Sequence, residues 1–190
     1  MEELTLIFRV ILGVMFFSSG ISKLKKMPEH FSILKDYRIL PASLIKPFGW
    51  CEVIAEVAVG LLLLSGFYQS IAAWTTMSLL VVYTLAIAIN LLRGRREISC
   101  GCGGVAGNHH LSWWLAIRNT VLFLIGGWLT EYTGTLGHFD LLFSGVSLSE
   151  VIGGQYWITL LIGLFSLLFY MSMTTLFGIG KRIESLLPSR

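Results

Sequence analysis

The sequence predicts an all-α membrane protein, a polytopic helix bundle. We expect four core transmembrane helices, a fifth transmembrane helix, and an interfacial half-helix between the first two. Of its 190 residues, 55% are hydrophobic and 13% are charged, and the mean hydropathy of +0.76 lies outside the range of ordinary soluble domains. Apolar stretches long enough to cross a bilayer recur along the chain. We expect a single transmembrane domain over residues 1–190.

The first predicted span covers residues 4–21. It lacks the cleavage pattern of a signal peptide, so we expect it to be retained. Lys23 follows it, at the expected membrane surface. Residues 28–47 are less hydrophobic and mix apolar with charged side chains, which favours a short helix in the membrane interface that ends at Pro41. A plain connecting loop is the alternative.

The second predicted span, residues 45–66, contains two carboxylates. Glu52 and Glu56 are four residues apart, so a helix places them on one face. A carboxylate inside a membrane costs several kcal/mol unless it is paired, protonated or hydrated, which makes both residues site candidates. A structural ion pair without a chemical role is the alternative.

The remaining predicted spans are residues 71–92, 113–129 and 156–177. Ser112 is a plausible N-cap for the fourth, and Arg118 interrupts the apolar sequence of that span. In an antiparallel bundle Arg118 lies at the same depth as Glu52 and Glu56, so we predict that they pair. Five spans place the two termini on opposite sides of the membrane.

The turn between the third and fourth spans carries the candidate chemistry. Cys100 and Cys102 are separated only by Gly101, whose backbone freedom lets the two thiols close a small ring. A disulfide in such a ring departs from relaxed geometry and is therefore readily reduced. The pattern favours a redox couple, and the nearby arginines 93, 95 and 96 favour the reactive thiolate.

Cys51, near the start of the second span, has two interpretations. It lies on the same side as the cysteine turn, so it could shuttle a disulfide to Cys100 or Cys102. A lone cysteine in an apolar helix is otherwise a small packed side chain.

Two other hypotheses remain beside a membrane thiol-disulfide oxidoreductase. The first is a metal site formed by Cys100, Cys102, His109 and His110, although this spacing fits no standard zinc module. The second is a non-enzymatic assembly factor that docks a partner through the interfacial helix. No basic patch is interleaved with aromatic residues, which argues against nucleic-acid binding.

The distribution of Lys and Arg predicts the sidedness of the chain. Twelve of the fourteen basic residues fall on the side that holds the cysteine turn, and the opposite connections have none. By the positive-inside rule this side is cytoplasmic. The twelve are Lys23, Lys25, Lys26, Lys35, Arg38, Lys46, Arg93, Arg95, Arg96, Lys181, Arg182 and Arg190.

Over residues 5–130 the chain resembles the methylamine-utilisation MauE family, within the broader DoxX-like group of membrane proteins. The most specific part of the match is Cys100-Gly101-Cys102-Gly103-Gly104. The other matching residues are Arg9, Gly13, Ser19, Gly20, Lys23, Leu24, Tyr37, Leu40, Pro41, Glu52, Glu56, residues 60–64 and Gly66.

This resemblance implies a role in maturing a disulfide-rich periplasmic enzyme subunit, beside thioredoxin-like or disulfide-containing partner proteins. The layout is also similar to that of vitamin K epoxide reductase and bacterial disulfide-forming membrane proteins, which use a quinone and carry two residues between their cysteines. The sequence fixes no cofactor, and a quinone is compatible with this similarity. Such relatives hold their cysteines on the outer face, whereas the charge distribution places the turn in the cytoplasm.

Overall fold

The computed structural model describes residues 1–101, 103, 110–132 and 134–186, the side chains only as far as residue 176 and without those of 171, 174 and 175. These residues form helices joined by short connections, and they contain no named strand, which confirms the predicted all-α class. The helices are α1 (Glu2–Lys25), α2 (Met27–Tyr37), α3 (Ala42–Ser65), α4 (Gln69–Leu92), α5 (Trp113–Glu131), the 3₁₀ helix η2 (Phe139–Ser144), α6 (Leu148–Val151) and α7 (Gly154–Leu186).

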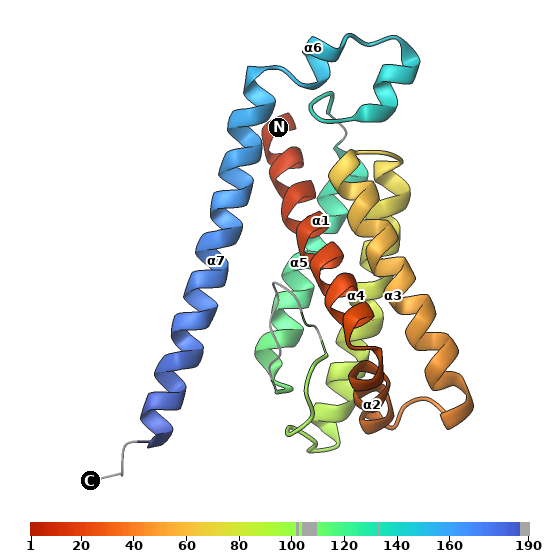
Figure 1. Cartoon of the computed structure of the whole chain (residues 1–190), viewed down its shortest axis with the longest axis vertical. Coiled ribbons are helices and arrows are strands. Elements are labelled where there is room, and N and C mark those ends of the chain that lie inside the picture. Colours follow the sequence, from red (N-terminus) through yellow and green to blue (C-terminus); the bar gives the residue numbers. More distant parts are fainter. Residues whose placement is uncertain (102, 104–109, 133, 187–190) are drawn as a thin grey trace.

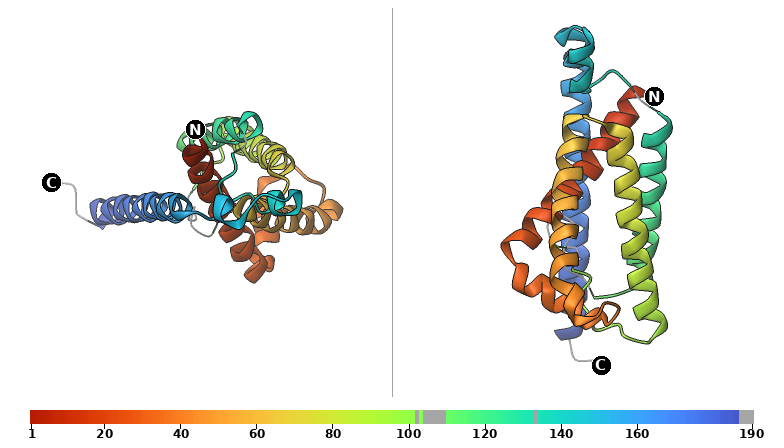
Figure 2. Two further views of the ribbon diagram at one scale, coloured as in Figure 1. Left: turned by 90° about the horizontal axis from the view of Figure 1, so that it is seen from above. Right: turned by 90° about the vertical axis from the view of Figure 1, so that its right-hand side faces the viewer.

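Helices α1, α3, α4 and α5 form an antiparallel bundle, and α7 packs against the N-terminal part of α1 and then diverges from the bundle (Figure 1). The bundle is seen end-on in Figure 2, where α7 projects away from the other helices. The core contains fully buried leucines from several helices, including Leu12 of α1, Leu63 of α3 and Leu129 of α5. The start of α1 and the end of α7 lie at opposite ends of the molecule, as an odd number of long helices requires.

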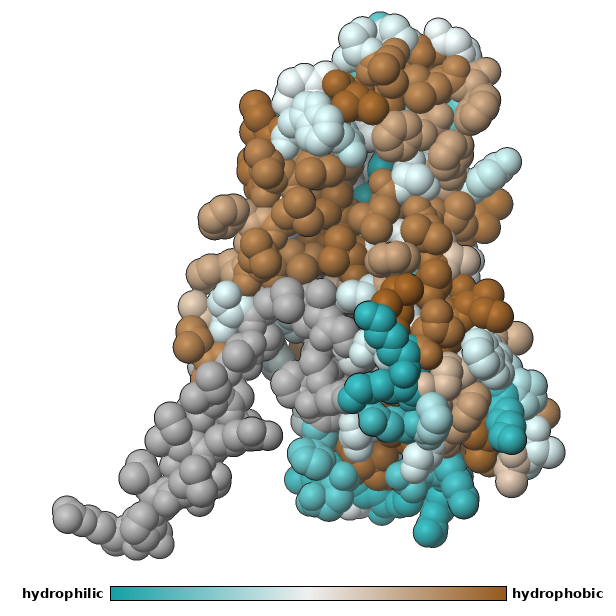
Figure 3. Space-filling view, in the orientation of Figure 1, coloured by the Kyte–Doolittle hydropathy of each residue, from teal (hydrophilic) through white to brown (hydrophobic). Residues whose placement is uncertain are grey.

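Four segments of the described residues are long and apolar enough to cross a membrane: α1, α3, α4 and Leu148–Tyr170, which leads into α7. Helix α5, the predicted fourth span, is not among them because Arg118 and Asn119 interrupt its apolar sequence. It nevertheless packs beside α4 over the height of the bundle. The molecule is a multi-pass membrane protein whose apolar surface forms a broad region above a hydrophilic end (Figure 3).

Helices α1 and α3 approach each other closely at a glycine. A Cβ atom on Gly60 would lie 2.6 Å from the backbone nitrogen of Phe17, closer than real Cβ contacts allow. Small residues at a helix interface permit such contact inside a membrane. This packing brings together the polar residues in the C-terminal part of α1 and the N-terminal part of α3.

A buried arginine of α1 binds the segment after α5 at the end of the bundle that lies opposite the cysteine turn. Arg9 is 1% exposed, and its guanidinium donates to the carbonyl oxygens of Leu63 at 2.9 Å, Leu136 at 3.4 Å and Gly137 at 2.7 Å. One side chain thus satisfies the C-terminal end of α3 and two carbonyls of the connection. This connection contains η2 and α6, which were not predicted from the sequence.

Two boundaries near the cysteine end differ from the prediction. Helix α1 continues to Lys25, so Lys23 lies inside a helix and is buried rather than placed at the membrane surface. The predicted helix after the first span exists as α2, but it ends at Tyr37, ahead of Pro41, and Arg38 caps it in a left-handed conformation. Pro41 instead precedes the first turn of α3, where its fixed φ fits the N-cap position.

Candidate functional site

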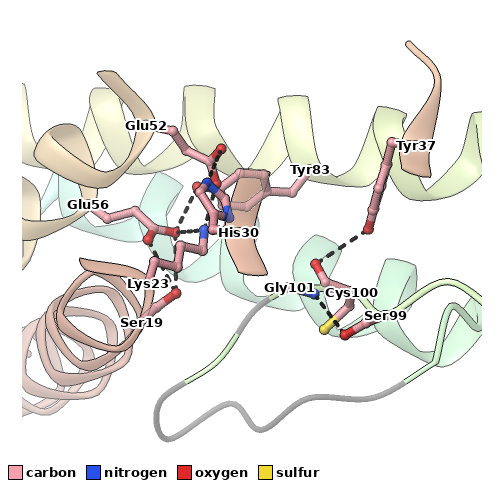
Figure 4. A network of polar contacts seen from close by, with 10 residues as sticks. All are labelled: Ser19, Lys23, His30, Tyr37, Glu52, Glu56, Tyr83, Ser99, Cys100 and Gly101. Atoms are coloured by element: carbon pink, nitrogen blue, oxygen red, sulfur yellow. Dashed lines mark hydrogen bonds and ion pairs between the residues drawn. The ribbon is translucent and has the colours of Figure 1, made fainter. Parts of the chain in front are cut away.

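A cluster of buried charges lies between α1 and α3 near the cysteine end of the bundle (Figure 4). The Nζ atom of Lys23 lies 2.5 Å from Glu52 Oε1 and 2.8 Å from Glu56 Oε1. The three residues are 7%, 6% and 1% exposed. One buried cation therefore bridges two carboxylates at a depth where each charge alone would be costly.

Polar side chains from three helices complete this cluster. The hydroxyl of Tyr83 on α4 donates to Glu56 Oε1 at 2.7 Å, and Ser19 on α1 donates to Glu56 Oε2 at 3.3 Å. His30 on α2 places Nε2 3.4 Å from Glu52 Oε2. We call Ser19, Lys23, His30, Glu52, Glu56 and Tyr83 the carboxylate cluster.

The helical spacing of the chain explains why these groups meet. Ser19 and Lys23 share one face of α1, and Glu52 and Glu56 share one face of α3, each pair four residues apart. Antiparallel packing of α1 on α3 brings these two faces together. The four-residue spacing in each helix is a sequence pattern from which these two polar faces could be paired. No such spacing marks His30 or Tyr83.

Lys23 is the cation of this cluster, which corrects the predicted pairing of the carboxylates with Arg118. Lys23 reaches both carboxylates because α1 extends one turn further than predicted. Arg118 is still close to this region, since it lines the same cavity as Glu52 and Glu56.

The segment around the cysteine turn is closed by a short neck. The backbone N–H of Leu111 donates to the Ile98 carbonyl at 3.0 Å, and Ser99 and His110 form an antiparallel bridge. The neck holds Cys100 against the lower end of the bundle, where it packs with a cluster that includes Tyr37, Leu91 and Leu115. The Tyr37 hydroxyl donates to the Cys100 carbonyl oxygen at 3.3 Å.

Gly101 has the conformation for which the sequence required a glycine. Its φ is +66°, and a Cβ atom there would lie 3.2 Å from Ile33 Cγ2 on α2. A larger residue would be both strained and crowded at this point. The turn thus depends on Gly101 for its path and on α2 for its support.

A cavity of about 360 Å³ connects the cysteine turn with the carboxylate cluster. Cys100 and Gly101 line it together with Glu52, Glu56 and Arg118, so it brings together all but two of the predicted site residues. Most of the lining is apolar, from α1, α2, α4 and α5. Its volume lies in the usual range of small-molecule sites.

Cys51 and Cys102 are the two predicted residues outside this arrangement. Cys51 is exposed on α3 and does not line the cavity, so its interpretation as a packed core side chain is wrong. Cys102 lies outside the residues that the structure describes.

The metal-site hypothesis gains no support from the part of the chain that the structure describes. No group of three or more His, Cys, Asp or Glu side chains is arranged there to hold a metal ion. His110 is exposed, and its Nδ1 lies 3.1 Å from the Glu97 carbonyl oxygen. Cys102 and His109, the other two predicted ligands besides Cys100, fall outside the described residues.

Comparison with known proteins agrees with this arrangement of residues. The family model described as "Methylamine utilisation protein MauE" matches residues 1–130, which include the carboxylate cluster and the cysteine turn. The chain belongs to the MauE family. This confirms the resemblance on which the sequence analysis relied.

Several MauE proteins are similar to this chain over most of its length. The methylamine utilization protein MauE of Paracoccus denitrificans is 34% identical over 174 residues, covering 90% of this chain and 86% of the relative. That of Methylorubrum extorquens is 34% identical over 144 residues, covering 72% and 75%. No solved structure matches the chain.

Proposed function

We propose that this MauE-family protein is a membrane thiol-disulfide oxidoreductase, a redox maturation factor acting on a thioredoxin-like or disulfide-containing partner protein. One observation supports it most. Cys100 is partly exposed and lines a cavity that also contains buried acidic and basic groups. A thiol placed between the surface and an internal polar cluster suits exchange with an external protein.

The exchange conserves electrons between the two proteins. A thiolate of one protein attacks a sulfur of the other protein's disulfide, and the S–S bond under attack breaks as a mixed disulfide forms. The second thiolate of the attacking pair then attacks its neighbour's sulfur in the mixed disulfide, and the other protein leaves with both of its cysteines as thiols. One dithiol becomes a disulfide while the other disulfide becomes a dithiol, in either direction. Cys100 and Cys102 form the pair in this chain.

The surroundings of the turn favour a reactive thiol. Exposed Arg93 and Arg96 precede the turn, and the Arg93 guanidinium donates to the Arg38 carbonyl at 3.3 Å, next to α2. Positive charge near a cysteine stabilises its thiolate, the form that attacks a disulfide. Glu52, Glu56 and Arg118 line the cavity behind the turn, and the two carboxylates can accept or return a proton.

Trapping a mixed disulfide tests the proposed exchange. In a Cys51→Ser background, Cys100→Ser and Cys102→Ser are expressed separately in cells that use methylamine. One of the two should accumulate a reductant-sensitive adduct with a partner protein, because the resolving thiol is missing. The double variant Cys100→Ser, Cys102→Ser should form no adduct and should lose maturation activity. A double variant with full activity would contradict the proposal and favour the assembly-factor hypothesis.

A further inference from the structure

The cavity beside Cys100 contains a buried hydrogen-bond donor without a partner. Asn119 on α5 lines this cavity and is 3% exposed. Its Nδ2 group makes no hydrogen bond to any residue that the structure describes. Burying an amide without a partner costs on the order of 1–3 kcal/mol, so such a group calls for an acceptor that binds in the cavity.

A second unpartnered nitrogen lies close to the carboxylate cluster. His30, 5% exposed, also lines the cavity, and its Nδ1 makes no hydrogen bond within the described part of the chain. Because Nε2 of His30 faces the Glu52 carboxylate, Nδ1 is the acceptor nitrogen of a neutral imidazole. Asn119 is on α5 and His30 is on α2, so the two groups come from different walls of the cavity. A ligand with an acceptor on an apolar frame would satisfy Asn119.

The walls and the opening of the cavity indicate the chemical character of the rest of the ligand. Val82 and Leu85 on α4 line the cavity and are also 43% and 56% exposed, so it reaches the apolar outer surface of the bundle. A molecule with an apolar tail could leave its tail among the lipids while its head stays inside. Most of the wall is apolar, which favours a mainly apolar ligand over a highly charged, water-soluble one.

We propose that this cavity binds a lipid-soluble molecule with ring carbonyl acceptors, a quinone by chemical class, and that Asn119 donates a hydrogen bond to one carbonyl. The redox reaction between this quinone and the two cysteines rests on the proposed function. Oxidation of the Cys100 and Cys102 thiols to a disulfide releases two electrons and two protons. The quinone takes up the two electrons and the two protons and becomes a quinol, so no other reactant is needed.

Binding of decylubiquinone to the purified full chain in lipid nanodiscs tests the site. Ligand that binds the folded state raises its thermal stability, which gives an affinity from a concentration series. Asn119→Leu should weaken this affinity about tenfold, the effect of one hydrogen bond, without lowering the stability of the free protein. Asn90→Leu is the matched control, because Asn90 is buried in α4 but does not line the cavity.

A substitution that fills the cavity tests the same binding site independently. Ala86→Phe introduces a ring into the cavity from α4 and should abolish binding, whereas Ala88→Phe on the same helix, away from the lining, should not. Unchanged decylubiquinone affinity in both Asn119→Leu and Ala86→Phe would overturn the proposal, as would absence of binding to the unmodified chain.

The cysteine variants separate this inference from the proposed function. Cys102→Ser, which leaves the cavity-lining Cys100 in place, should still bind decylubiquinone with an affinity within a few-fold of that of the unmodified chain, while losing the complete dithiol-disulfide exchange. Quinone binding with no thiol exchange in the unmodified protein would contradict the proposed function and leave the binding site intact. Thiol exchange without quinone binding would contradict only the site.

Discussion

Lys23 neutralises two carboxylates inside the bundle, so its removal should be costly. Lys23→Met leaves Glu52 and Glu56 buried without their cation. Breaking a buried ion pair on one side typically costs about 3–5 kcal/mol, and we expect a loss of this order in the free energy of unfolding. Denaturant unfolding in detergent measures it.

The control for this prediction lies three residues further along the chain. Lys26 pairs with Glu29 at 3.3 Å, but both side chains are more than 60% exposed. Lys26→Met should change stability by less than about 1 kcal/mol. The triple variant Lys23→Met, Glu52→Gln, Glu56→Gln should recover most of the loss. Equal effects of Lys23→Met and Lys26→Met would refute the buried bridge.

His138 predicts a pH dependence at the opposite end of the molecule. Burial, and next the positive charge of Arg9, lower the pKa of His138 from 6.5 to about 4. The folded state therefore binds fewer protons than the unfolded state between these values. Stability should be full above pH 6.5 and should fall by on the order of 1–3 kcal/mol as the pH drops to 4.

Thermal unfolding between pH 7 and pH 4 checks this contribution. His138→Gln removes the titrating group and should flatten the curve between pH 6.5 and 4. A variant curve that runs parallel to the original would show that other groups cause the acid sensitivity.

At the residue scale, the sequence predicted the carboxylates and the cysteine turn because both stand out by their chemistry. It did not predict the partners of the carboxylates. Lys23 follows an apolar stretch and therefore resembled a surface residue, and only the extra turn of α1 buries it. Tyr83 is one of many aromatic residues, and its role depends on the packing of α4 against α3.

Among the helices, the contact between α1 and α3 depends on Gly60. Gly60→Ala would place a Cβ atom 2.6 Å from the Phe17 backbone nitrogen, so the two helices must separate. Overpacking of this kind costs about 1–3 kcal/mol. Because the carboxylate cluster spans this contact, we expect Gly60→Ala to lower the midpoint of thermal unfolding.

A glycine on α5 provides the comparison. A Cβ atom on Gly127 would meet only Met77 Cε, at 4.0 Å. Gly127→Ala should therefore leave stability unchanged or raise it by up to about 1 kcal/mol, since alanine favours a helix over glycine. A greater loss for Gly127→Ala than for Gly60→Ala would contradict the proposed close packing.

At the element scale, hydrophobicity predicted the long helices well but not their ends. The predicted start of the second span at residue 45 is three residues late, because Pro41 initiates α3 instead of only ending the preceding segment. The connection after α5 had no apolar periodicity. Just before η2, Arg9 of α1 donates to the carbonyls of Leu136 and Gly137, a long-range contact that no local pattern contains.

For the whole molecule, the exposed basic residues at the hydrophilic end predict that the cysteine turn faces the cytoplasm. Labelling with a membrane-impermeant maleimide in a Cys51→Ser background checks this. Cys100 should react only after the membrane is permeabilised. Labelling in intact cells would show that the turn lies on the outer face. The surrounding arginines would then belong to the reactive site and would not indicate the cytoplasmic side.

The central claim is that Cys100 and Cys102 act as one dithiol-disulfide couple, and a redox titration tests it most directly. The purified Cys51→Ser protein is equilibrated in glutathione buffers of increasing oxidation, alkylated and weighed by mass spectrometry. Both thiols should disappear together in one two-electron transition and return on reduction. Two thiols that stay reduced throughout, or that form only separate glutathione adducts, would contradict it.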